Sequence, residues 1–95
     1  MLEGGLSVIL KVMHDYASDA EIQKRGCQAL HVLALYYVNK ETVAQEGGVA
    51  AILNAMKSHT NEGLLNVYGC RAFLILAQCF NNRPSMVHGG VIGVV

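Results

Sequence analysis

Apolar residues recur along the chain with the spacing of a single helical face. Four of them at positions i, i+3, i+4 and i+7 form this pattern twice: Leu6, Ile9, Leu10 and Met13, and later Val49, Ile52, Leu53 and Met56. Such spacing is typical of an amphipathic helix. A pair of glycines precedes each stretch, and glycine reaches backbone angles that other residues avoid. The pattern therefore predicts two helices of similar length, each beginning after a break at its glycine pair.

A longer apolar stretch follows each of these helices. The connecting segments "YASDAEI" and "SHTNEGL" are rich in Ser, Asp, Thr and Asn, residues that favour loops and helix N-caps. Beyond them we expect long helices over about residues 20–38 and 62–80. The polar stripe of the first long helix is narrow and consists of Lys24, Gln28 and His31. A helix this apolar is expected to be covered on nearly all sides.

Two short polar segments complete the pattern. The segments "NKETVAQE" and "NRPSMVH" each predict a short helix, and Pro84 stands early in the second, where proline is tolerated. A short, a middle and a long helix therefore form one unit. The segment "RGCQALHVLA" at residues 25–34 returns as "YGCRAFLILA" at residues 68–77, an offset of 43 residues. Repetition at this length is typical of stacked-helix arrays.

The repeat divides one domain, residues 1–95, into copies. The first spans about residues 1–38 and the second about residues 39–81, and a truncated third copy, residues 82–95, contains "HGGV" where the others have "EGGL" and "EGGV". Neither helix of a unit can bury its apolar faces alone, so stacking leaves apolar ends wherever it stops. We therefore expect the chain to self-associate through its exposed repeat ends.

The pattern "GG(V)xxILxxM … GCxALxxLA … N", spread over three helices, resembles an armadillo repeat. The resemblance implies an all-α fold, an armadillo-like right-handed α-solenoid of three-helix repeats. HEAT repeats have a similar length, but the break between the short and middle helices favours armadillo. In armadillo proteins the long helices line a concave groove, where peptide-binding members carry a Trp and, four residues later, an Asn. The matching positions here hold Gln28 and Val32, then Arg71 and Ile75, so importin-like binding of basic peptides is not expected.

Composition narrows the partners and the compartment. Seven basic residues balance seven acidic ones, so there is no basic footprint for nucleic acid. No apolar run approaches the ~20 residues that span a bilayer, so a membrane partner is not expected. Three cysteines, two of them at matching repeat positions, indicate reduced, buried thiols. We expect a cytoplasmic protein, with the nucleus as the alternative.

The residues that could carry chemistry do not form a recognisable site. Cys27 and Cys70 lack the close spacing of a zinc-binding pair, and we expect them, like Cys79, to be packing residues. The four histidines are not spaced for a site, and no acid and nucleophile converge. We therefore expect no catalytic residue, no cofactor and no metal. Gly26 and Gly69, inside the long helices, predict a close contact with the middle helix of the same unit.

These observations favour a non-catalytic protein–protein interaction scaffold that binds a partner on the concave surface of its long helices. The residues expected on that surface are Lys24, Gln28, His31, Val32, Leu35, Arg71, Leu74, Ile75 and Gln78. Apolar patches between single polar groups suit a helix or a folded protein surface better than a charged extended peptide. The alternative is a structural repeat segment of a larger multidomain protein, with a spacing or regulatory role.

Overall fold

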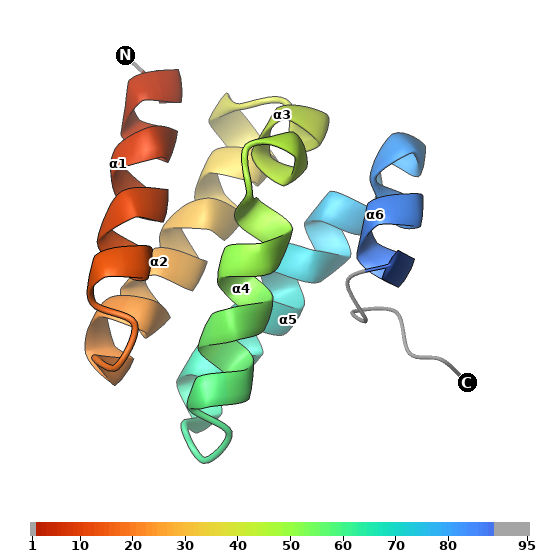
Figure 1. Cartoon of the computed structure of the whole chain (residues 1–95). Coiled ribbons are helices and arrows are strands. Elements are labelled where there is room, and N and C mark those ends of the chain that lie inside the picture. The colour runs from red at the N-terminus through yellow and green to blue at the C-terminus, as the bar shows by residue number, and fades with distance from the viewer. Residues whose placement is uncertain (1, 89–95) are drawn as a thin grey trace.

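Helices make up every regular element in the part of the chain that the structure describes. The structure is a computed structural model and describes residues 2–88, without the side chains of residues 2, 3, 37 and 85 (Figure 1). Its elements in order are α1 (Leu2–Asp15), α2 (Ala20–Val32), η1 (Leu33–Tyr37), α3 (Lys40–Gln45), α4 (Gly48–Ser58), α5 (Gly63–Ala77), η2 (Phe80–Asn82) and α6 (Arg83–His88). The predicted all-α class is confirmed. The part of the predicted third copy beyond residue 88 lies outside the described residues.

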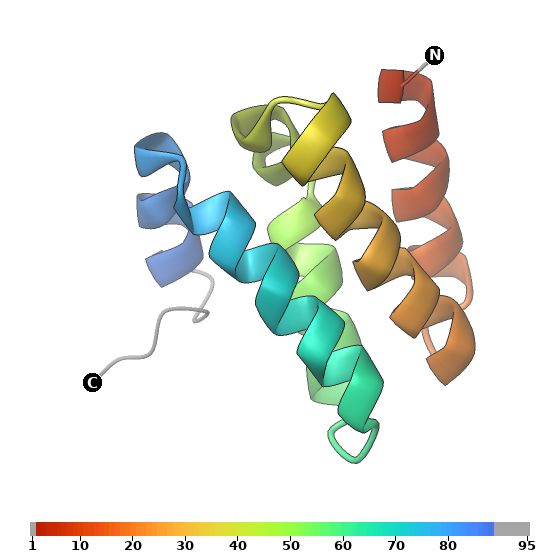
Figure 2. The same cartoon turned by 180° about the vertical axis from the view of Figure 1, so that it is seen from behind.

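The helices form two layers. Figures 1 and 2 show α1 and α4 on one side of the molecule and α2 and α5 on the other. Within each predicted unit the middle helix packs on the long one, α1 on α2 and α4 on α5. The most extensive packing joins α2 to α5, so the two units meet mainly through their long helices.

The starts of the helices follow from local side-chain and backbone chemistry. Asp19 Oδ1 accepts a hydrogen bond from the backbone N–H of Ile22 at 3.0 Å, which caps α2 as the sequence predicted. The break before α4 is also confirmed, because Gly47 has a left-handed φ of 111° between α3 and α4. The break predicted at Gly4 and Gly5 is wrong, since both residues lie inside α1.

The long helices end earlier than predicted. Regular α-helix in the first stops at Val32, and a wider π-helical turn, η1, continues the chain. The backbone N–H of Val38 bonds the carbonyl of Leu33 at 2.7 Å, which is the i→i+5 bond of a π-turn. The second long helix ends at Ala77 and gives way to the 3-10 turn η2.

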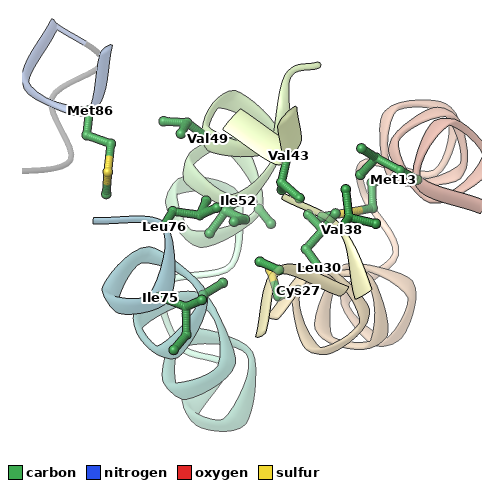
Figure 3. Packing of buried hydrophobic residues seen from close by; sticks show 14 of the residues in the cluster. Met13, Cys27, Leu30, Val38, Val43, Val49, Ile52, Ile75, Leu76 and Met86 are labelled. Carbon is green, nitrogen blue, oxygen red and sulfur yellow. The ribbon is translucent and has the colours of Figure 1, made fainter. Parts of the chain in front are cut away.

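The hydrophobic core lies between the two layers and along the seam where α2 meets α5. Figure 3 shows Cys27 of α2 and Ile75 of α5 in the space between these helices. The largest fully buried side chains are Leu6, Leu30, Ile52, Leu65, Leu76, Met86, Val43, Asn82 and Cys27. Every buried polar side-chain atom of the described residues has a hydrogen-bond partner. No buried side chain there therefore destabilises the fold through an unsatisfied donor or acceptor.

The predicted close approach at the two helix-interior glycines is confirmed. A Cβ added to Gly26 would collide with the side chain of Met13 in α1. A Cβ added to Gly69 would meet Met56 in α4 in the same way. Gly69 and Met56 each stand 43 residues after their counterparts, so the two units share this contact in detail.

A second matched contact was not predicted. Gln23 Nε2 donates to the carbonyl of Tyr16 at 2.9 Å, fastening the loop before α2. Asn66 Nδ2 donates to the carbonyl of His59 at 3.2 Å, fastening the loop before α5. Both donor and acceptor are displaced by 43 residues between the units. The two side chains differ in type, so the sequence repeat is not visible at these positions.

Candidate partner-binding surface

The layer formed by α2 and α5 carries most of the residues expected to bind a partner. Gln28 and Val32 on α2 and Leu35 on η1 recur at helical spacing, and all three are at least partly exposed. Arg71 on α5 and Gln78, the C-cap of α5, occupy the corresponding positions and are exposed. These five residues define the outer face; they belong to the α2–α5 layer, which is nearest the viewer in Figure 2.

Three of the expected residues lie at the flanks of the long helices. Lys24 and His31 share a side of α2 with Cys27, which is fully buried and faces α5 (Figure 3). Only 21% of the Lys24 side chain is exposed, and its Nζ lies 3.0 Å from Glu21 Oε1. Leu74 occupies the same flank of α5, where it is 67% exposed.

Ile75 is not part of the accessible surface, and that prediction is wrong. Its side chain is only 9% exposed because α2 covers this side of α5. The corresponding residue of the first unit, Val32, is 38% exposed. The local sequence is similar at both positions, so the difference comes from the neighbouring helix alone.

The cysteines also differ between the units. Cys27 is buried as predicted, and its burial raises the pKa of the thiol to about 11. Cys70 was predicted to be buried and is exposed, because α5 has no neighbouring long helix on its second flank in the described residues. Cys79 is half-buried. Only Cys27 is therefore the fully enclosed packing residue that was expected.

A charged network near the N-terminal end of α2 was not predicted. Arg25 Nε donates to Glu21 Oε2 at 2.9 Å, and the Arg25 guanidinium also reaches Gln28 Oε1 at 3.2 Å. The Lys24 ammonium, followed by Arg25, holds the pKa of the Glu21 carboxyl below its usual value. The spacing Glu at i and Arg at i+4 is a signal that the sequence already contained. On α5 the residue that corresponds to Glu21 is the exposed Leu64.

Two apolar depressions lie elsewhere on the molecule. A pocket of about 340 Å³ between α1 and α4 is lined by small or apolar residues such as Leu10, Ala50 and Ala51. A groove of about 340 Å³ runs between α1 and α2 and is lined by Val8, Val12 and Ile22, with Glu21 and Arg25 at its edge. Neither depression gathers the acid, base and nucleophile of a reaction centre.

Residues that could hold a metal or catalyse a reaction are scattered over the described part of the chain. Within residues 2–88, no three His, Cys, Asp or Glu side chains are grouped so that they could hold a metal ion. His14 lies on α1 beside Asp15, and His59 Nε2 lies 2.9 Å from the carbonyl oxygen of Ala17. Among the helices described, none combines the length and apolar character needed to cross a membrane.

Comparisons with known proteins add no relative: no protein-family model, curated protein or solved structure matches the chain.

Proposed function

We propose that the chain is a non-catalytic protein-interaction scaffold whose outer face, Gln28, Val32, Leu35, Arg71 and Gln78, binds a helix or a folded protein surface. The observation that carries the proposal is the alignment of α2 and α5 in one layer, which presents these residues together. Extended surfaces built from repeated helices serve chiefly to bind other macromolecules.

The finer fold belongs to the same proposal: an armadillo-like right-handed solenoid of three-helix repeats. Two contacts recur between the units at an offset of 43 residues and support it. They are the packing of a methionine on a helix-interior glycine and the fastening of the loop before each long helix. The break at Gly47, between the short and middle helices of the second unit, supports it further.

The kind of partner follows from the chemistry of the outer face. The face combines apolar Val32 and Leu35 with the donors and acceptors of Gln28, Arg71 and Gln78. It has no ladder of asparagines to hold an extended backbone. Its only charged residue is Arg71, which is positive. A partner with apolar side chains bordered by a carboxylate fits best, and an amphipathic helix supplies both.

A site-specific photocrosslinking experiment tests the proposal. A photoreactive amino acid is placed at Val32, at Arg71 and, as the control, at Lys57, which is exposed on α4 in the other layer. We expect the same protein to crosslink at Val32 and Arg71 in an extract of the source cell, and not at Lys57.

The captured protein is then purified and its affinity measured by calorimetry. Arg71→Glu and Val32→Glu should each weaken binding by at least about tenfold, the change that 1.4 kcal/mol produces. Lys57→Glu should leave the affinity unchanged. Equal effects at all three positions, or an effect at Lys57 alone, would contradict binding at the outer face.

A further inference from the structure

Corresponding residues of the two units differ in exposure in a systematic way. On one side of the unit the first copy is the more exposed: Val12 is half-open to solvent whereas Ala55 is buried, and Val32 is open whereas Ile75 is buried. On the other side the second copy is the more exposed, since Cys27 is buried and Cys70 is not. Each unit thus buries the flank that touches the other unit and exposes the opposite flank.

Two exposed faces result, and each has a buried counterpart within the molecule. The α1–α2 face consists of Val8, Val12, Ile22, Ala29 and Val32 and includes the apolar groove between these helices. The α5 face consists of Val67, Cys70 and Leu74. Val8 is 61% and Leu74 is 67% exposed, although both are large apolar side chains.

The seam between α2 and α5 shows what fits each face. In that seam Leu65, Ala72 and Ile75 of α5 are buried against α2. These residues correspond to Ile22, Ala29 and Val32 of the α1–α2 face. The α5 face in turn corresponds to the flank of α2 that carries Lys24, Cys27 and His31 and is covered by α5. The molecule therefore already contains an interface between surfaces equivalent to its two exposed faces.

Charge does not oppose the same contact between two molecules. The α5 face replaces Lys24 and His31 of the internal seam by Val67 and Leu74, so less polar surface would lose water on contact. Glu21 and Arg25, the charged residues at the edge of the α1–α2 groove, form an ion pair in which Arg25 Nε donates to Glu21 Oε2 at 2.9 Å, so neither charge is left without a partner at the groove.

We propose that a second copy of this chain docks head to tail, with the α1–α2 face of one molecule on the α5 face of the next. The contact reproduces the α2–α5 seam and places Cys70 where Cys27 lies in the internal interface. Because the two faces differ, the contact is heterologous and leaves one of each free, so association continues into open chains. Val32 belongs to both the α1–α2 face and the outer face, but the other residues of the α1–α2 face and all of the α5 face lie outside the outer face, so self-association can be tested independently of partner binding.

Sedimentation analysis of the 95-residue chain over a concentration series tests the proposal. We expect the wild-type chain to form dimers and then larger species as concentration rises. Val8→Arg blocks the α1–α2 face and Leu74→Arg blocks the α5 face, and each variant alone should be a monomer. Mixed in equal amounts, the two variants should form a heterodimer that grows no further, because each retains one working face. Gln45→Arg is the matched control, since Gln45 and its counterpart His88 are both exposed.

Alkylation of Cys70 provides a second measurement that does not depend on particle size. The rate should fall by about tenfold or more between dilute and concentrated wild-type chain, and should stay constant for Leu74→Arg. A monomeric wild-type chain throughout the series would overturn the proposal. So would dimers of either arginine variant alone, which would mean that like faces pair, or a mixture of the variants that stays monomeric.

Discussion

Gly26 and Gly69 determine how closely the two layers approach, because each lies against a methionine of the opposite layer. Replacing either by leucine improves helix propensity by up to about 1 kcal/mol. The added side chain, however, would collide with Met13 or Met56. We expect Gly26→Leu and Gly69→Leu each to lower the free energy of unfolding by about 1–3 kcal/mol, as overpacked cores do. Urea melts measure this change.

Gly5 supplies the matched control, because it also lies inside a helix but has open space where a Cβ would stand. Gly5→Leu should raise the free energy of unfolding by up to about 1 kcal/mol. If Gly26→Leu or Gly69→Leu behaved like Gly5→Leu, the helices would not be in close contact at these glycines.

Because the Cys27 thiol is buried, we expect the free energy of unfolding to fall at alkaline pH. Burial raises the pKa of this thiol from 9.0 to about 11, so the folded chain holds the proton more tightly than the unfolded chain does. The resulting stabilisation is fully present below about pH 9 and is lost as pH rises towards 11. The free energy of unfolding should therefore fall more steeply between pH 8 and 10.5 in the wild-type chain than in Cys27→Ala.

Cys70→Ala is the control for that comparison, because Cys70 is exposed. Its pH dependence should match that of the wild-type chain. Parallel curves for wild type and Cys27→Ala would show that the Cys27 thiol is not held in its protonated form by burial.

At the scale of single elements, Gln23 fastens the end of α1 to α2. It is buried, and its amide donates to the carbonyls of Met13 and Tyr16, both at 2.9 Å. Gln23→Met keeps the volume and removes both bonds; the carbonyl of Tyr16 still accepts from the backbone N–H of Asp19 at 2.9 Å, whereas that of Met13 loses the Gln23 donor. The change should cost about 1–3 kcal/mol of unfolding free energy. Thermal and urea melts give the value. Gln45→Met removes an exposed amide, and should change stability by less than about 0.5 kcal/mol.

The elements show which features a sequence of this kind predicts and which it does not. The apolar spacing predicted α1, α4 and the bodies of α2 and α5, since that spacing depends on the helix alone. The π-turn η1 was missed because the segment "LALYYV" contains no Gly or Pro to mark a change. Both glycine pairs were predicted to break the chain before a helix, yet only the second pair does so, because Gly47 lies between α3 and α4.

The candidate surface was less predictable than the helices, because exposure depends on the neighbouring helix. Gln28, Leu35, Arg71 and Gln78 lie at exposed or half-exposed positions, as partner binding requires. Ile75 does not, since the helical spacing that exposes Val32 in α2 places Ile75 against α2. Sequence spacing gives the phase of a residue on its helix, and the packing of other helices decides whether that phase is open to solvent.

At the scale of the whole molecule, the contribution of a neighbouring unit to stability can be measured by truncating Leu33 and Leu76 and comparing the two losses. They are the same residue type at the same repeat position. Leu76 is fully buried, whereas Leu33 is only partly buried against the core. Truncating a leucine costs transfer energy and the energy of the cavity that remains, and both grow with burial. We therefore expect Leu76→Ala to lower the free energy of unfolding by about 3–5 kcal/mol and Leu33→Ala by about 2 kcal/mol.

Urea melts at micromolar concentration, where association is weakest, give the two values for the single chain. Losses that agree within about 0.5 kcal/mol would mean that cover by the neighbouring unit does not set the stability of a unit. Repeating the melts at high concentration extends the test to docked copies. A second molecule on the α1–α2 face would cover the side of the first unit that includes Val32 next to Leu33. The loss caused by Leu33→Ala should then rise towards that of Leu76→Ala, because the first unit would acquire the neighbour that the second already has.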